Sequence, residues 1–223
     1  MTLIAPPAFD VPPMLRTRLT FDHLAIVAPS LEAGVAHVRK RLGVDAPAGG
    51  VHPLMGTHNH LMRLGETCFL EIIAIDPGAP APERPRWFGL DRRGDAPPRL
   101  EHWLLATNDL DATLDEAGGL GGEAIRQTRG ELSWRIAVRP DGALPMGGAF
   151  PGLLEWSTGT HPAAGMADLG CRLSVLTIDH PEAERISRFL EGRLIDARIR
   201  VRNAAGPNLS AEIETPSGTR VLG

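Results

Sequence analysis

Apolar residues in this chain fall into short runs bounded by Gly, Pro, Ser and Asp, a pattern typical of β-strands. One run, "FLEIIAIDP" at residues 69–77, is apolar almost throughout but carries Glu71 near its start. A carboxylate in an apolar site is costly unless an opposite charge, hydrogen bonds or a metal ion compensates it. The alternative is a half-exposed strand with Glu71 on its wet face.

The pattern around Glu71 occurs twice. Residues 22–33, "DHLAIVAPSLEA", resemble residues 101–112, "EHWLLATNDLDA": an acid and a His open an apolar stretch, and a capping residue follows. Downstream, "FLEII" resembles "LLEWS". His23 therefore matches His102, and Glu71 matches Glu155. A duplicated His and Glu pair is stronger evidence for a site than one Glu.

The segments between these motifs predict one βαβββ unit in each half. In the first half, Ser30 caps an amphipathic helix that Gly43 ends, and in the second Asp109 caps a helix that ends at Gly118. The predicted divisions are 20–77 for the first unit, 78–99 for a Pro-rich linker, 100–160 for the second unit and 170–223 for a C-terminal partial βαββ repeat. In that repeat Arg172 takes the place of the His, so we expect a structural role.

The linker carries Trp87 and Phe88 side by side, which a plain connector rarely needs. We expect this aromatic pair to fold back, either onto the core or over a cleft as part of its wall. In the second case Trp87 contacts substrate.

Strand residues alternate between the two faces of a sheet, so the helix of each unit covers one face and the His points to the other. If the two units face each other about a pseudo-twofold axis, four side chains converge: His23, Glu71, His102 and Glu155. Mixed N and O ligands suit Zn, Ni, Co, Mn or Fe(II), with positions left open for substrate. The sequence therefore predicts a divalent metal site, although no local motif such as HExxH marks it.

The motifs "DHLAIV", "FLEII", "EHWLL" and "LLEWS" together resemble the glyoxalase-like branch of the vicinal oxygen chelate superfamily, over residues 20 to about 160. The resemblance implies an α+β fold in which two tandem βαβββ units form a paired, cupped mixed sheet with helices on its outer face. In glyoxalases the metal ligands match His23, Glu71, His102 and Glu155. The superfamily also contains metal-free binding proteins and Fe(II) dioxygenases, so membership does not fix the chemistry.

Three functions follow from these alternatives. The first is a metal-dependent lyase or isomerase that chelates a small substrate through vicinal oxygens and stabilises an enediolate, with Glu155 or Glu71 as the base. The second is a metal-free small-molecule binding or sequestration protein. The third is an Fe(II) dioxygenase, for which a triad of His23, His102 and Glu155 stays open.

Two further residues are candidates for substrate binding. Asn59 orients substrate oxygens if it faces the cavity, but a polar, half-exposed strand explains its neighbourhood equally well. Arg135 can anchor a substrate carboxylate through two hydrogen bonds if its face looks into the cleft. The alternative is an Arg that faces solvent above a buried Trp134.

Composition argues against nucleic acid and membranes as partners, so we expect the partner to be a small molecule. The net charge is −4 with both signs interspersed, which argues against nucleic acid. No apolar run approaches the roughly 20 residues that span a bilayer, and the first 19 residues lack a signal-peptide pattern. The two Cys residues are far apart and favour the cytoplasm. One chain can complete the site, so we expect a monomer or a homodimer.

Overall fold

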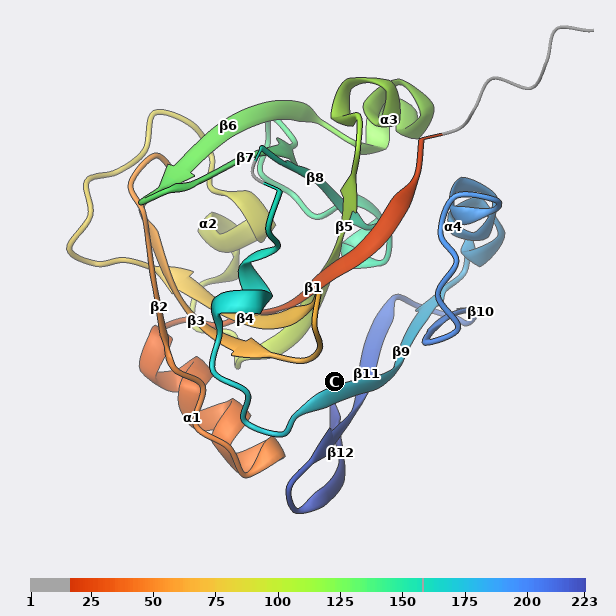
Figure 1. The fold of residues 1–223 in the computed structure, drawn as a ribbon. Helices are drawn as coiled ribbons and strands as arrows, with labels where there is room; N and C mark the ends of the chain where they lie inside the picture. The colour runs from red at the N-terminus through yellow and green to blue at the C-terminus, as the bar shows by residue number, and fades with distance from the viewer. Residues whose placement is uncertain (1–16, 158) are drawn as a thin grey trace, which may run out of the picture.

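A large mixed sheet dominates the computed structural model, which describes residues 17–157 and 159–223. Its strand order is β2-β3-β4-β1-β5-β8-β7-β6, and it curves into a cup (Figure 1). The strands are β1 (Leu19–Val27), β2 (Ala48–His52), β3 (Thr57–Arg63), β4 (Phe69–Ile75), β5 (Arg99–Thr107), β6 (Glu123–Arg129), β7 (Leu132–Val138) and β8 (Gly152–Trp156). β1 pairs in parallel with β4, and β5 with β8, as two copies of one unit require.

The predicted α+β fold class is confirmed. The exact unit boundaries stay predictions, and most of the N-terminal stretch searched for a signal lies outside the described residues.

Each unit places one helix after its first strand. The Ser30 hydroxyl accepts a hydrogen bond from Ala33 N at the start of α1 (Leu31–Leu42), and Gly43 ends that helix at a φ of 72°. Asp109 accepts from Ala112 N at the start of α3 (Leu110–Ala117). The predicted caps are therefore present. No helix among the described residues is long and apolar enough to cross a membrane.

Two β-bulges shape the centre of the cup, where β1 and β5 run antiparallel. One extra residue stands in each strand: Asp22 in β1 and Glu101 in β5, each directly before its His. A bulge changes which face the following residues point to. In β1 it leaves both Phe21 and Leu24 in the outer core while Asp22 and His23 contact each other. Glu101 instead pairs with Arg93 of the linker.

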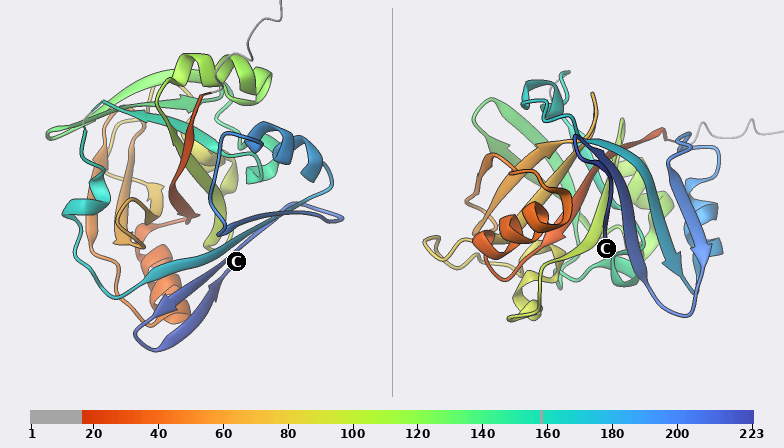
Figure 2. Two further views of the ribbon diagram at one scale, coloured as in Figure 1. Left: turned by 45° about the vertical axis from the view of Figure 1, so that its right-hand side comes forward. Right: turned by 90° about the horizontal axis from the view of Figure 1, so that it is seen from below.

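A second, smaller sheet covers the outer face of the cup. Its order is β10-β9-β11-β12, and it lies outside the cup with α4 beside it (Figure 2). Its elements are β9 (Arg172–His180), α4 (Ala183–Leu190), β10 (Ile199–Asn203), β11 (Asn208–Thr215) and β12 (Gly218–Leu222). This C-terminal extension has one strand more than the expected βαββ repeat, because Thr215 and Gly218 pair across a tight turn into β12. It also differs in topology, since β9 pairs in parallel with β10.

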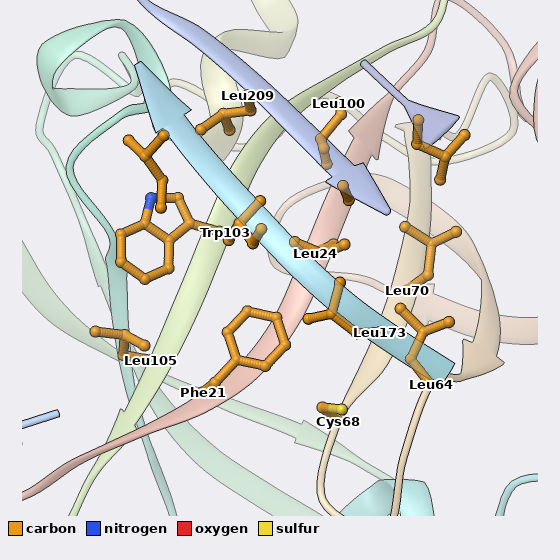
Figure 3. Close-up of a cluster of buried hydrophobic side chains, with 14 of the residues drawn as sticks. Phe21, Leu24, Leu64, Cys68, Leu70, Leu100, Trp103, Leu105, Leu173 and Leu209 are labelled. Atoms are coloured by element: carbon orange, nitrogen blue, oxygen red, sulfur yellow. The ribbon is translucent and has the colours of Figure 1, made fainter. Parts of the chain in front are cut away.

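The outer core joins the two sheets. Leu173 and Leu209 of the small sheet lie over Leu24, Leu100 and Trp103 of the large one (Figure 3). Trp103 is fully buried, and its Nε1 donates to the Ala149 carbonyl at 2.9 Å. The C-terminal segment is therefore part of the main core, in keeping with the structural role expected for it.

The linker enters the concave side of the cup. Trp87 and Phe88 begin a short 3₁₀ turn (Trp87–Gly89), followed by α2 (Leu90–Arg93), and both aromatic side chains are buried in the concave apolar cluster. Phe88 has a φ of 57°, a left-handed conformation that is unfavourable for a bulky residue and persists only where the surroundings hold it. The linker thus fills the cup and does not merely join its halves.

We expect Trp103→Ala to lower the free energy of unfolding by about 3–5 kcal/mol, because it removes the largest fully buried side chain beneath the small sheet. Urea unfolding followed by circular dichroism measures this change. Arg126→Ala, at an exposed position of β6, is the control and should stay within about 0.5 kcal/mol of the wild type. Equal stability of all three proteins would contradict this packing.

Candidate functional site

A narrow cleft lies on the concave face of the cup. Its walls come from all the strands of the large sheet except β5 and from the linker, and its volume is about 40 Å³, room for only a few waters. A wider opening of about 530 Å³ shares Leu61, Arg129 and Pro162 with the cleft. Trp87 and Phe88 line the cleft, so the aromatic pair is both core and wall.

Glu71 is buried in this cleft and is held by two partners. Its Oε1 accepts a hydrogen bond from Asn59 Nδ2 at 2.6 Å, and its Oε2 lies 3.6 Å from His23 Nε2. Asn59 is oriented in turn, because its Oδ1 accepts from Gly50 N at 2.8 Å. The cost of burying this carboxylate is therefore offset by an imidazole and an amide. Of the two alternatives left open for Asn59, its side chain lies on the cavity side, and its contact with substrate stays a prediction.

Asp22 fixes His23 from the other side. The Asp22 carboxylate is fully buried and accepts from three donors: His23 Nδ1 at 2.6 Å, Trp156 Nε1 at 2.7 Å and His161 Nε2 at 3.0 Å. His161 Nδ1 accepts from Ala163 N, so its Nε2 carries the proton. The resulting chain runs from Asp22 through His23 to Glu71 and Asn59, and it holds the His23 ring with Nε2 toward Glu71.

Sequence reasoning missed Asp22 and His161. Strict alternation put Asp22 on the face opposite His23, and the bulge overrides that rule. The acid that precedes each His in both halves was the signal that could have found it. His161 comes from the loop after β8, and no local pattern links it to β1.

The charges of this array follow from its contacts. Burial alone would lower the pKa of His23, but hydrogen bonds to Asp22 and Glu71 outweigh it and raise that pKa to about 9. Burial would likewise raise the pKa of Asp22, but hydrogen bonds from His161 and His23 lower it to about 2. The pKa of Glu71 is lowered, since the contact with His23 exceeds the effect of burial. At neutral pH the array therefore holds an imidazolium between two carboxylates.

His102 lies on the same face but in a different environment. Its Nδ1 is 3.3 Å from the Gly148 carbonyl, and its ring is 5.5 Å from that of Phe88. Burial lowers the pKa of His102 to about 4, so the ring is neutral at pH 7.

The second unit has no carboxylate at the position of Glu71. In β1 the residue two after His23 is Ala25, whose partner on β4 is Glu71; in β5 the residue two after His102 is Leu104, whose partner on β8 is Gly152. A Cβ at position 152 would lie only 2.7 Å from His102 Nε2. The imidazole therefore occupies the space that a side chain at 152 would need.

Glu155 lies on the outer face of β8. Its Oε2 accepts from Leu110 N, at the start of α3, at 3.0 Å and lies 3.6 Å from Arg135 Nη1. Arg135 shares that face and also pairs with Asp111. The similarity of "FLEII" and "LLEWS" reflects composition and not register, so the expectations that Glu155 and Arg135 face the cleft are corrected.

The predicted four-ligand metal site is therefore not assembled. Only His23 and Glu71 approach each other, and among the described residues no three His, Cys, Asp or Glu side chains are placed to hold a metal ion. The Fe(II) triad fails for the same reason, because it needs Glu155. The donors present do not fit the predicted metal ion, and the chemistry of the cleft is derived from its side chains.

Other cleft residues were not singled out from the sequence. His52 is buried, its Nδ1 lies 3.0 Å from Thr57 Oγ1, and burial lowers its pKa to about 4. Trp134 and Trp156 add aromatic walls from β7 and β8. Arg129 reaches the cleft from the end of β6. The cleft is thus mostly aromatic, with a charged array at one side and one Arg at its opening.

Comparison with known proteins places the chain in a family. A family model described as a glyoxalase-like domain matches residues 21–194, more than half of the chain. A search of curated proteins found no match. A hypothetical protein from Staphylococcus aureus has a TM-score of 0.57 and 13% identity, with 85% of this chain and 88% of that chain covered. At this identity the likeness supports the fold alone.

Two epimerase structures resemble the chain less closely. A Streptomyces coelicolor methylmalonyl-CoA epimerase in complex with 2-nitronate-propionyl-CoA has a TM-score of 0.42 and 16% identity, covering 62% of this chain and 97% of that one. A methylmalonyl-CoA epimerase in complex with methylmalonyl-CoA and NH4+ has a TM-score of 0.43 and 17% identity, covering 66% and 99%. These scores are too low to support a functional argument. The family match and the paired βαβββ units agree, and the chain belongs to the glyoxalase-like domain family.

Proposed function

We propose that the protein is an isomerase- or lyase-type enzyme that removes a proton next to a carbonyl group of a small substrate with two neighbouring oxygens. The observation that carries this proposal is the array of Asp22, His23, Glu71 and Asn59 in an aromatic cleft. A base and a hydrogen-bond donor lie side by side there, which is what enolisation requires.

Glu71 is the base in this mechanism. It is ionised, and Asn59 holds its Oε1, so Oε2 is the oxygen that takes the substrate proton. The electron pair of the broken C–H bond moves to the carbonyl oxygen and creates an enolate or enediolate. Glu71 returns the proton to the same or a neighbouring carbon, which completes an isomerisation; loss of a group from the next carbon completes an elimination.

His23 stabilises the oxyanion that forms. Its Nε2 lies 3.6 Å from Glu71 Oε2, so one substrate can reach both groups, and Asp22 holds its Nδ1–H. A positioned imidazolium donor in a site shielded from water stabilises a developing negative charge more than water does. The walls that shield it include Trp87, Trp134 and Trp156.

A small-molecule binding or sequestration protein is the second candidate. The aromatic lining favours it, since such a lining suits binding without chemistry. Proton exchange separates the two candidates, because a binding protein does not accelerate it.

Wild-type protein should accelerate deuterium exchange of dihydroxyacetone or pyruvate in D2O, and Glu71→Gln should slow that exchange by at least about a hundredfold, since general base catalysis is lost. Proton NMR of the probe measures the rate. Glu155→Gln, on the outer face, is the matched control and should exchange as the wild type does. Loss of exchange in Glu155→Gln alone would contradict the assignment of the base.

The exchange rate should fall as pH rises through about 9, because His23 must keep its proton and its folded-state pKa is raised to about that value. The titratable side chains that act on His23 are Asp22, Glu71, His52 and His102. Asp22→Asn removes the carboxylate that raises the pKa of His23 most. The fall in exchange rate should therefore occur at lower pH in this variant. The pH profiles of the exchange rate in both proteins test this. If the rate falls at the same pH in both, His23 is not the group whose deprotonation lowers it.

Metal removal should have little effect. Because the predicted ligands do not converge, we expect far less than one divalent ion per chain by elemental analysis of the purified protein. Dialysis against EDTA should leave the exchange rate and the melting temperature unchanged. About one ion per chain, lost together with the exchange rate, would restore the metal-dependent mechanism and require His102 to turn toward His23.

A further inference from the structure

Three buried N–H donors, two from residues that line the cleft and one from the same strand as Arg129, have no hydrogen-bond partner among the described residues. They are Arg129 Nη1, Gln127 Nε2 and Trp87 Nε1. Buried polar groups in folded proteins are almost always paired, so each exception needs an explanation, and a ligand that supplies acceptors is one. All three groups donate, and therefore the missing partner is rich in oxygen lone pairs.

The fold places two of these donors on the same face of β6. Ile125, Gln127 and Arg129 are spaced two residues apart along β6, so their side chains lie on the same face of the strand. Ile125 packs against the concave apolar cluster, which shows that this face is the concave one. Gly50 on the facing β2 makes room for Arg129, because a Cβ there would lie 2.7 Å from Arg129 Cδ. The guanidinium carbon lies 6.0 Å from the Trp134 ring centroid, within the range of a cation–π contact. Arg129 is thus held at the cleft without being neutralised.

The two charged residues Glu71 and Arg129 differ in whether the cleft supplies them with a partner. Among the described residues that line the cleft and its opening, Arg129 is the only Arg or Lys and Glu71 is the only acid. Glu71 is already held by Asn59 and His23, whereas Arg129 forms no ion pair with any described residue. A guanidinium is shaped to bind a carboxylate through two parallel hydrogen bonds. Arg129 can therefore bind an anion that no described residue supplies.

We propose that Arg129 is the substrate anchor of this cleft and that the substrate is a small carboxylate with a second oxygen on the neighbouring carbon, a 2-hydroxy or 2-oxo acid. The carboxylate binds Arg129, and the second oxygen reaches toward His23 Nε2. The narrow cleft limits the acid to a small one while Trp87 and Phe88 stay in place. The identity of the reacting carbon rests on the proposed function; the binding of the carboxylate to Arg129 does not.

Titration of tryptophan fluorescence with glycolate and with glycolamide tests the anchor, because the two probes have the same size and differ in the carboxylate. EDTA is present throughout, so that binding through a metal is prevented. Wild type should bind glycolate and prefer it over glycolamide, and Arg129→Met should weaken glycolate binding by at least about tenfold. Arg129→Lys keeps the charge but loses the paired geometry and should fall between them.

Arg126→Met is the matched control, since Arg126 lies on the same strand but on its exposed face. Its glycolate affinity should equal that of the wild type, and circular dichroism confirms that each variant is folded. The proposal is overturned if Arg129→Met binds glycolate as the wild type does, if glycolamide binds equally well, or if the wild type does not bind glycolate.

Glu71→Gln separates this inference from the proposed function. It should lose proton exchange but keep glycolate binding. If the wild type exchanges no protons while its glycolate binding depends on Arg129, the anchor stands and the enzyme proposal fails. If exchange depends on Glu71 while Arg129→Met matches the wild type in binding and exchange, the enzyme proposal stands and the anchor fails.

Discussion

The pairing of β1 with β5 is the constraint on which the rest of the molecule depends. It joins the two units into one sheet, places Leu24 and Trp103 in the outer core, and carries a bulge in each strand. A regular ladder would have sent Asp22 and His23 to opposite faces. Because of the bulge, one buried carboxylate contacts His23 and orients its ring toward Glu71.

Periodicity and self-similarity were sufficient to predict one βαβββ unit in each half, because each unit repeats the same strand composition and the same helix caps, while the family resemblance implied the cupped sheet. Ser30 and Asp109 cap the helices as their positions imply. The pairing of His23 with Glu71 also follows from simple alternation within β1 and β4. These features depend on short-range rules that sequence carries directly.

The rest of the site depends on register, which sequence similarity does not encode. The resemblance between "FLEII" and "LLEWS" placed Glu155 opposite Glu71, but the ladder between β5 and β8 puts Gly152 there. In the same way the sequence made Arg135 the candidate for binding an anion, but its side chain lies on the outer face. Arg129 on the neighbouring strand is the arginine whose side chain lines the cleft. Only the pairing of strands decides between such neighbours, since a shift by one residue exchanges the faces.

The two acid–His bulges make different contacts, and the residues of the second bulge contact the linker. Glu101 pairs with Arg93, and the His102 ring lies beside Phe88, so both residues of that bulge contact the segment that fills the cup. In the proposed function the first bulge supplies His23, while the second contacts the linker residues that line the cleft. In such a protein, the range of accepted ligands can evolve in one half without disturbing the chemistry of the other.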